Sequence, residues 1–328
     1  MLSIDGSMGE GGGQVLRTAL SVACVLGKPV RITNIRAGRS QPGLKAQHLT
    51  VCKLLAQITN AKMSGAALGS TEIEFSPEEI SGGEYSFDIG TAGSITLLLQ
   101  AALPVLAHAK HPSSLSITGG THVAFSPTFD YFSEVFLPAV AKLGIKAEAK
   151  MLAAGFYPKG GGRVEMRVRP SRLIGAKFEP QQHKQILYGI ISSGLPPHVA
   201  EREEHELKKM LDGKEVSGKI NEVHASCVGN AITVWSGLVG ASSLGETGKP
   251  AEKVAGEAAE ALLAEIGASA SVDSHLADQL LLYAALAEGK SAYTTSKFTQ
   301  HLTTNAAVLS SLTGRNIRLA NERDVTVD

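Results

Sequence analysis

The chain has 328 residues, 43% of them hydrophobic, which is enough for one large core or for two domains of ordinary size. Its 31 Lys and Arg residues balance its 31 Asp and Glu residues, so any nucleic-acid contact must be a local patch rather than the effect of a global positive charge. The three cysteines lie far apart without a CxxC pair, and no apolar stretch approaches the roughly 20 residues of a membrane span, so we expect a soluble cytoplasmic protein with neither disulfides nor a structural zinc site, and with no membrane partner.

A recurring pattern of elements predicts a repeated α/β unit. Strand-like runs are followed by glycine-rich or Ser/Thr-rich turns and then by helices whose apolar positions share one side. The first helix, for example, places Val15, Leu16, Ala19, Leu20, Ala23 and Leu26 on one apolar stripe. In chain order, the predicted helices are 14–26, 95–106, 129–143 and 301–312, and the predicted strands include 28–35, 71–75, 115–118, 163–168 and 316–319. We therefore expect an α/β (α+β) fold with an internal repeat of about 80 residues.

The composition changes between residues 178 and 268. This segment is more polar, includes the charged run EREEHELKK, and then carries a predicted strand at 231–235 and a predicted helix at 251–266. The glycine-turn pattern of the first half resumes after it. A smaller domain inserted into a larger one explains the interruption more simply than two consecutive domains do. We expect residues 1–177 and 269–328 to form the large domain and residues 178–268 the inserted one.

Glu10 stands inside a glycine run, DGSMGEGGGQVLR at 5–17, that opens the first helix. Glycine allows close backbone approach there, and the free N–H groups of a helix N-terminus favour an anion such as phosphate. Glu10 either caps the helix or holds a divalent cation that bridges to phosphate. The chain has neither GxGxxG nor GxxxxGK[ST], so the usual dinucleotide and Walker motifs do not account for the run.

Two arginines stand three residues apart in a Pro/Gly turn, in RAGRSQPGLKAQH at 36–48. The guanidinium groups of Arg36 and Arg39 can both face one phosphate, because their donors match its oxygens. The alternative is that both are ordinary solvated arginines. His48 falls in register with Leu44 and Cys52 on the next helix, so a half-buried structural histidine is the alternative for that residue.

His301 is the sharpest candidate for a catalytic residue. It stands in TTSKFTQHLTTN, near the start of the last predicted helix, with Asn305 one turn further along the same face. The N–H groups at a helix start favour a neutral imidazole, which suits a nucleophile that attacks phosphorus. The chain has 10 histidines, so the surroundings of His301 single it out only weakly.

Together these segments resemble the RNA 3'-terminal phosphate cyclase family, in its catalytic branch. The resemblance implies a large domain of repeated βαβαββ-type units, similar to the C-terminal domain of the third bacterial translation initiation factor, with a smaller inserted α/β domain. The matching motifs follow the family's order over nearly the whole chain: DGSMGEGGGQVLR, NIRAGRSQPGLKAQHL, GTAGSITLLLQ, GGTHVAFSPTFDY, GFYPKGGGRV, GLPPHVAERE, GETGKPAEKV, HLADQLL and TQHLTTN.

The resemblance also implies the reaction. His301 would attack the α-phosphorus of ATP, release pyrophosphate and carry AMP as a covalent adenylate. AMP would then pass to the 3'-phosphate of an RNA end. The vicinal 2'-hydroxyl would close the 2',3'-cyclic phosphate and expel AMP, a step that gains from proximity. The expected substrates are ATP and RNA with a 3'-phosphate end, and the expected metal is Mg²⁺ or Mn²⁺.

The matched positions give each site residue an implied role. Glu10 would bind the metal at the triphosphate. The phosphates of ATP or of the RNA end would be surrounded by Arg17, Arg36, Arg39, Gln47 and His48. The nucleotide pocket would be formed by Gln100, His275, Leu276, Ala277, Asp278 and Gln279. Some family members carry tyrosine where this chain has His275; histidine still stacks on adenine, so the difference bears on nucleotide preference.

The sequence leaves three alternatives. A non-catalytic, RNA-processing branch of the same family lacks the histidine that this chain keeps at 301. The enolpyruvyl transferases, on a related repeat architecture, bind two phosphorylated small molecules and form no covalent nucleotide. The third alternative is an RNA-binding module whose ATP pocket has decayed. Exposed strand edges permit a homodimer without requiring one.

Overall fold

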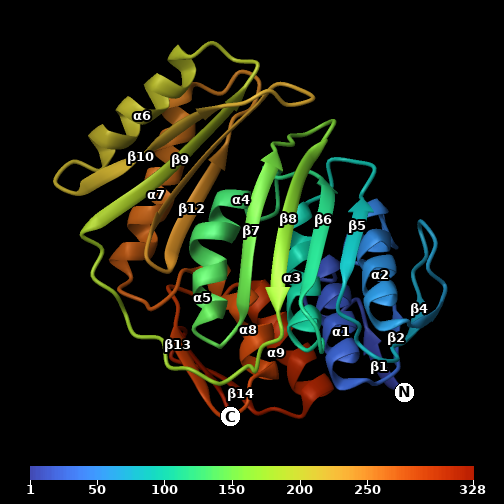
Figure 1. Cartoon of the computed structure of the whole chain (residues 1–328). Coiled ribbons are helices and arrows are strands. Elements are labelled where there is room, and N and C mark those ends of the chain that lie inside the picture. Colours follow the sequence, from blue (N-terminus) through green and yellow to red (C-terminus); the bar gives the residue numbers. More distant parts are fainter.

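The computed structural model describes all 328 residues and contains four small sheets with helices between them (Figure 1). The first unit runs β1 (Leu2–Asp5), α1 (Gly13–Leu26), β2 (Val30–Thr33), α2 (Ala46–Thr59), β3 (Lys62–Ser64) and β4 (Ile73–Ser76). Its sheet has the order β1-β2-β4-β3, with β1 and β2 parallel and the other pairs antiparallel.

The second unit repeats this arrangement. It runs β5 (Glu84–Asp88), α3 (Ile95–Ala107), β6 (Ser113–Gly119), a helical segment, β7 (Lys146–Ala153) and β8 (Gly162–Arg169). Its order, β5-β6-β8-β7, and its single parallel pair, β5 with β6, match those of the first unit. The expected α/β (α+β) fold of repeated βαβαββ units is thus confirmed.

The third unit is divided in the sequence. It contains α8 (Ser274–Leu286), β13 (Ser291–Thr294), α9 (Gln300–Thr313), β14 (Ile317–Ala320) and β15 (Asp324–Val327), in a sheet of order β13-β15-β14. The position of its first strand is taken by residues 174–177, which form parallel bridges to residues 288–292. The chain leaves this unit after its first extended segment and returns to it at α8.

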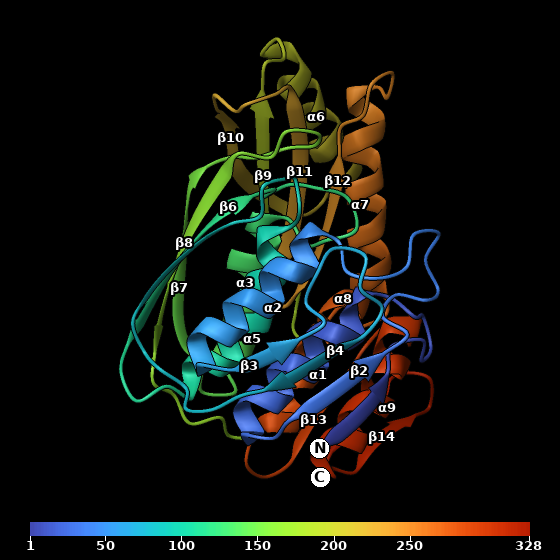
Figure 2. The ribbon, with the colours of Figure 1, turned by 90° about the vertical axis from the view of Figure 1, so that its right-hand side faces the viewer.

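Residues between these two points form the fourth sheet with two helices. The elements are β9 (Gln185–Ser193), α6 (His198–Met210), β10 (Glu215–Glu222), β11 (Gly229–Ser236), β12 (Val239–Leu244) and α7 (Ala251–Gly267). We call these elements the small sheet unit; its strand order is β10-β9-β11-β12. It occupies one end of the molecule in both views (Figures 1 and 2). The proposed domain limits at 178 and 268 stay a prediction.

The apolar residues divide in the same way. One cluster of 66 buried residues joins the three repeated units, and α1 packs against α2, α3 and α9 within it. A separate cluster of 15 buried residues lies within 186–262. Because α1 is surrounded by helices, Thr18 and Ser21 are buried beside its apolar stripe, whereas Leu26 at its end is 36% exposed. The predicted apolar stripe is confirmed at Val15, Leu16, Ala19, Leu20 and Ala23, which are buried, but not at Leu26.

The helix predicted at 129–143 is interrupted. It comprises α4 (Phe129–Tyr131), a π-helical turn (Phe132–Phe136) and α5 (Leu137–Ala141). In the π turn, the N–H of Leu137 bonds to the carbonyl of Phe132, five residues back. Pro138, which follows directly, has no N–H to continue the α-helical ladder, and this accounts for the change in winding.

No helix combines the length and the apolar character that crossing a bilayer requires.

Candidate active site

The glycine run before α1 allows two side chains to lie against the backbone. Gly9 and Gly11 have φ of 56° and 58°, a region that glycine adopts without strain. A Cβ at Gly13 would lie 2.2 Å from Nε2 of His48 and 3.2 Å from Nη1 of Arg17. The N-terminus of α1 therefore meets the start of α2 so closely that a side chain at position 13 would displace His48.

His301, the second residue of α9, faces this same loop. Its Nδ1 lies 2.9 Å from Oε1 of Gln14 and also contacts a carboxylate oxygen of Glu10. Both partners are hydrogen-bond acceptors, so Nδ1 carries the proton and donates it. Nε2 makes no hydrogen bond within the chain. Burial lowers the pKa of His301, and the charges of Arg17 and Arg39 and the neighbouring His275 lower it further, so the ring is neutral with a free lone pair on Nε2.

Glu10 connects His301 to the arginine turn. One carboxylate oxygen pairs with Arg39 and the other with Nδ1 of His301, while the backbone N–H of Glu10 bonds to Oγ1 of Thr304 at 3.3 Å. Gly12, not Glu10, is the N-cap of α1, and no side chain caps that helix. The helix-cap alternative for Glu10 is therefore wrong.

Glu10 also limits what kind of metal site this cluster can form. No group of three or more His, Cys, Asp or Glu side chains is arranged to hold a metal ion. The site thus offers one carboxylate and no all-protein cage. Mg²⁺ commonly binds in this way, through one or two carboxylates together with substrate phosphates. The residues present fit a cation that arrives with a polyphosphate.

The predicted phosphate-binding residues have different surroundings. Arg17 is half-buried on α1; burial lowers its pKa to about 10 and Asp278 opposes that shift, so the side chain is charged at neutral pH. His48 is buried, and burial together with Arg17, Arg36 and Lys45 lowers its pKa to about 3. His48 is therefore neutral, and its Nδ1 accepts from the N–H of Lys45 at 3.3 Å.

Arg36 and Gln47 are partly engaged in holding the fold. Nη1 of Arg36 donates to the carbonyls of Gln41 and Gly43 at 2.8 and 2.7 Å, inside its own turn. Oε1 of Gln47 accepts from the N–H of Ser94 at 2.9 Å, which joins α2 to the N-terminus of α3. The two arginines of the turn are thus not equivalent, because Arg39 reaches Glu10 and Arg36 closes the loop.

The predicted nucleotide-pocket residues divide into two groups. Nε2 of Gln100 lies 2.5 Å from Oε1 of Gln279, and Oδ1 of Asp278 accepts from Gln14 at 3.3 Å. Burial raises the pKa of Asp278 to about 8. His275 is exposed at the start of α8. Leu276 and Ala277, by contrast, are fully buried in the large apolar cluster, so their side chains seat α8 rather than face a ligand.

Sequence reasoning missed Gln14 and Thr18, which join these groups. Gln14 bonds to both Asp278 and His301, and Thr18 donates to Oδ1 of Asn305 at 2.8 Å. Asn305 in turn donates to the carbonyl of Asp278 at 3.1 Å. A polar side chain on a buried helix face was the available signal, since Thr18 sits among the apolar residues of α1. We call Glu10, Gln14, Arg17, Arg39, His48 and His301 the His301 cluster.

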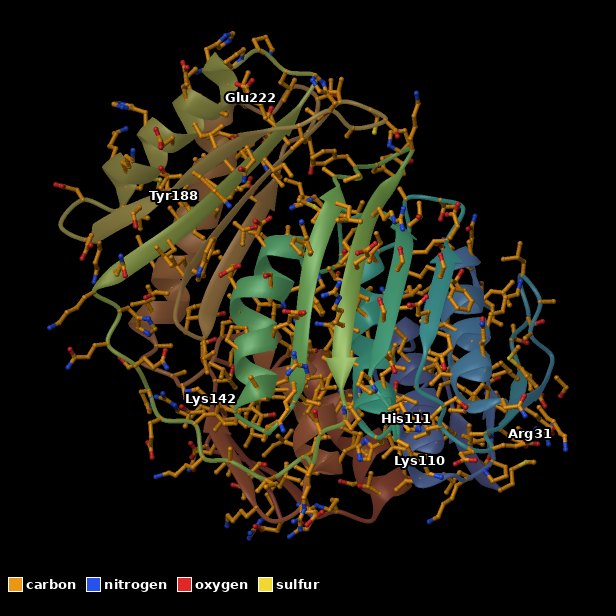
Figure 3. All side chains as sticks on the ribbon, in the orientation of Figure 1. Arg31, Lys110, His111, Lys142, Tyr188 and Glu222 are labelled. Atoms are coloured by element: carbon orange, nitrogen blue, oxygen red, sulfur yellow. The ribbon has the colours of Figure 1, made fainter.

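Several cations elsewhere on the surface pair with exposed acids. Arg31 pairs with Glu72 at 2.6 Å, and Lys110 pairs with Glu79 at 2.5 Å; Figure 3 shows Arg31 at the right-hand edge of the molecule and Lys110 in its lower right part. On the small sheet unit, the hydroxyl of Tyr188 contacts Glu204 of α6. None of these pairs joins the His301 cluster.

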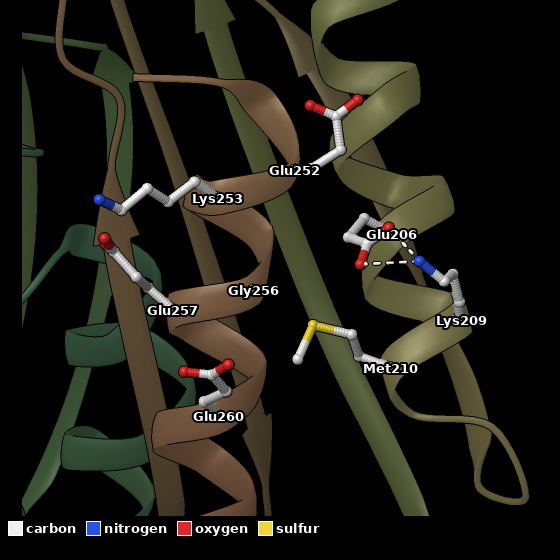
Figure 4. Close-up of a pocket in the computed structure, with 8 residues that line it drawn as sticks. All are labelled: Glu206, Lys209, Met210, Glu252, Lys253, Gly256, Glu257 and Glu260. Atoms are coloured by element: carbon white, nitrogen blue, oxygen red, sulfur yellow. Dashed lines mark hydrogen bonds and ion pairs between the residues drawn. The ribbon is translucent and has the colours of Figure 1, made fainter. Parts of the chain in front are cut away.

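A hollow on the small sheet unit has the wrong chemistry for a phosphate. It lies between α6 and α7, and we call it the α6–α7 groove (Figure 4). Four glutamates outnumber two lysines there, so an anionic ligand would be repelled. Its lining residues are Glu206, Lys209, Met210, Glu252, Lys253, Gly256, Glu257 and Glu260.

Comparison with known proteins gives a consistent result. Residues 8–319 match the family model of RNA 3'-terminal phosphate cyclase. A relative of that name from Archaeoglobus fulgidus is 44% identical over 98% of this chain and 99% of its own. Another, from Methanosarcina barkeri, is 47% identical over 93% of this chain and 92% of its own.

Among solved structures, the enolpyruvyl transferase NikO from Streptomyces tendae covers 100% of this chain and 48% of its own, at 12% identity and a TM-score of 0.41. That likeness is too weak to support a conclusion. The family match spans almost every element described above and includes all residues of the His301 cluster, from Glu10 to His301. The chain belongs to the RNA 3'-terminal phosphate cyclase family.

Proposed function

We propose that this chain uses His301 as a nucleophile toward ATP in order to convert RNA 3'-terminal phosphates into 2',3'-cyclic phosphates. The family match over nearly the whole chain makes it an RNA 3'-terminal phosphate cyclase, a ligase with RNA and ATP as substrates. The mechanism rests on one observation above all: Nδ1 of His301 is held by Gln14 and Glu10, whereas Nε2 has no partner.

The first step follows from that arrangement. The lone pair of Nε2 forms a bond to the α-phosphorus of ATP, and the bond from that phosphorus to the pyrophosphate oxygen breaks. No proton has to leave Nε2, because the lowered pKa keeps the ring neutral beforehand. The adenylated ring becomes an imidazolium, and the carboxylate of Glu10 next to Nδ1 stabilises that positive charge.

The cations of the cluster favour the approach of the two anions. Arg17 and Arg39 both lie close enough to His301 to lower its pKa, so their positive charges also act on a phosphate bound there. Gln100 and Gln279 present amide groups on α3 and α8 that suit the edge of a base. The same side of the site is supported by Arg36 in the turn and by Gln47 and His48 of α2.

The remaining steps need less from the protein. An oxygen of the RNA 3'-phosphate attacks the phosphorus of the histidine adenylate, and the P–N bond breaks to leave neutral His301. The 2'-hydroxyl oxygen then bonds to the activated phosphorus and its proton passes to solvent, while the bond from that phosphorus to the AMP oxygen breaks and the ring closes. This last step is intramolecular and gains from proximity. Because it requires a 2'-hydroxyl, a DNA end would stop at the adenylate.

Glu10 is the residue that would hold Mg²⁺ or Mn²⁺ beside the triphosphate. When bound, such a cation neutralises phosphate charge and stabilises the charge that develops on the leaving pyrophosphate. The paired state of Glu10 does not prevent this, because each carboxylate oxygen has lone pairs to spare.

A labelling experiment tests the nucleophile. With α-³²P-labelled ATP and metal, wild-type protein should become covalently labelled, and His301→Ala should show no label. His205→Ala, at an exposed histidine of α6, is the matched control and should label like the wild type. Equal labelling of His301→Ala would overturn the mechanism. Failure of the wild type to cyclise a 3'-phosphorylated oligoribonucleotide would overturn the activity.

Location and assembly belong to the same proposal. All three cysteines are free, two of them buried, which suits a reducing cytoplasm. β10 is an edge strand with mostly exposed residues, which leaves an edge available to a second copy in a homodimer. A single sedimentation-equilibrium measurement would decide between monomer and dimer.

A further inference from the structure

A buried carboxylate outside the His301 cluster joins three elements at the N-terminus of α8. Asp273 is fully buried and is the N-cap of that helix. Its Oδ1 accepts from the N–H groups of His275 and Leu276 at 2.9 and 2.8 Å. Both of its oxygens accept from the hydroxyl of Tyr131, at 2.8 and 2.9 Å, and Oδ2 accepts from the N–H of Gly240 at 3.0 Å.

These partners come from different parts of the chain. Tyr131 ends α4 in the second repeated unit, and Gly240 belongs to β12 of the small sheet unit. A Cβ at Gly240 would lie 3.1 Å from the ring of Tyr131, so β12 packs directly on that side chain. Four hydrogen-bonding groups thus converge on one carboxylate that no water reaches, far more than a helix cap requires.

A second contact ties α8 to the small sheet unit. Glu265 of α7 accepts from the hydroxyl of Ser274 at 2.6 Å and from its N–H at 3.2 Å. Ser274 is the first residue of α8. Two successive residues, Asp273 and Ser274, therefore attach the first turn of α8 to β12 and to α7.

That first turn leads into the predicted nucleotide pocket. His275 is the next residue, and Asp278 and Gln279 follow one turn later, bonded to Gln14 and Gln100. Gln14 in turn holds His301. A shift of the α8 N-terminus would thus move the base-facing residues directly and His301 only through Gln14.

We propose that Asp273 is a positioning residue, which sets the nucleotide-pocket segment of α8 through its bonds to Tyr131 and to β12. This makes the small sheet unit part of the ATP-binding apparatus without contact to ATP. The inference rests on the proposed function, since it assumes that His275 and Gln279 face the nucleotide.

Asp273→Asn separates the two roles of the carboxylate. The amide oxygen can keep the bonds from His275 and Leu276, while its NH₂ group would face the N–H of Gly240, donor against donor. The α8 cap survives and the link to β12 is lost. We expect KM for ATP to rise about tenfold, with KM for the RNA end and kcat within about twofold of wild type.

Tyr131→Phe provides a second variant that keeps the packing. It removes only the hydroxyl, and we expect KM for ATP to rise about threefold. Tyr85→Phe is the matched control, because Tyr85 of β5 also donates its hydroxyl to another residue, the carbonyl of Ser81, and has no contact with Asp273. That variant should leave KM for ATP unchanged.

Direct binding distinguishes this idea from the proposed reaction. Calorimetry of ATP binding in a His301→Ala background measures affinity without chemistry, and Asp273→Asn should weaken it about tenfold there as well. If Asp273→Asn lowers only the melting temperature, or raises both KM values equally, Asp273 merely holds the fold and the inference is wrong. If ATP binds but wild type forms no adenylate, the proposed reaction fails and this inference still stands or falls on the binding data.

Discussion

The His301 cluster and the α6–α7 groove both gather charged side chains, but only one of them is built for an anion. In the His301 cluster, Arg17, Arg39 and His48 are drawn against backbone glycines, and burial shifts the pKa of Arg17 and His48. In the groove, pairs such as Arg202 with Glu252 are exposed at its rim. A hollow by itself therefore does not identify a binding site. Charged side chains that are partly buried beside glycines, with shifted pKa values, are the better indicator.

The two regions also differ in what holds them. The cluster is joined by polar bonds between residues far apart in the chain, such as Gln14 with His301. The small sheet unit has its own apolar cluster and a periphery of ion pairs. Changes in the first region should therefore alter chemistry, whereas changes to the exposed ion pairs of the second should alter stability slightly or not at all.

The largest difference between the two regions is expected when an arginine is removed from each. Arg39→Ala removes the cation that pairs with Glu10 beside His301, and we expect the rate of adenylate formation to fall about a hundredfold. Arg202→Ala breaks an exposed pair and should leave that rate unchanged, with little or no loss in the free energy of unfolding. Single-turnover labelling measures the first effect. Equal rates for the two variants would remove Arg39 from the site.

Two glycines give the next test. Gly13→Ala would place a Cβ 2.2 Å from Nε2 of His48, so His48 or the loop must move, and we expect at least about a tenfold loss of activity. Gly256→Ala in α7 would meet only Sδ of Met210, at 3.5 Å, and should stabilise the helix by up to about 1 kcal/mol. Activity assays with thermal unfolding check both. A fully active Gly13→Ala would mean that the close approach is not needed.

The smallest effect concerns pH and stability. The pKa of His48 is lowered to about 3 in the folded chain, so between pH 3 and about 6.5 the unfolded chain binds the extra proton. The free energy of unfolding should therefore rise with pH across that window, by about 1 kcal/mol per pH unit from this group. The contribution of His48 to stability is lost as the pH falls. The slope for His48→Gln should be lower than that of the wild type by about 1 kcal/mol per pH unit.

Asp278 acts with the opposite sign, because burial raises its pKa to about 8. Asp278 is present in both proteins, so its contribution to the pH dependence cancels when the wild type is compared with His48→Gln. Denaturant titrations at pH 4.5, 5.5 and 6.5 provide the measurement. Parallel curves for the two proteins would contradict the buried, neutral state of His48.

Most element positions could be predicted because their signals are local. Predicted helices 95–106 and 251–266 differ from α3 and α7 by one residue at one end, since glycine or proline marks the start and apolar periodicity the body. The helix at 129–143 could not be predicted as a π-helical turn, because the change in winding depends on how the chain accommodates Pro138. The burial of Thr18 and Ser21 beside the apolar stripe of α1 could not be predicted, because it depends on the three helices that pack around α1.

What the sequence determined by itself was the chemistry available: a carboxylate in a glycine run, arginines in a turn, and a histidine at a helix start. Only the tertiary structure decided which of them meet. Gln14 and His301 are 287 residues apart, and Arg36 and Arg39 differ by three, yet Gln14 contacts His301 and Arg36 turns into its own loop. The spacing of residues determines which side chains share a face of one helix or strand. Contacts between elements depend on how the three repeated units pack around α1, and no local sequence pattern contains that information.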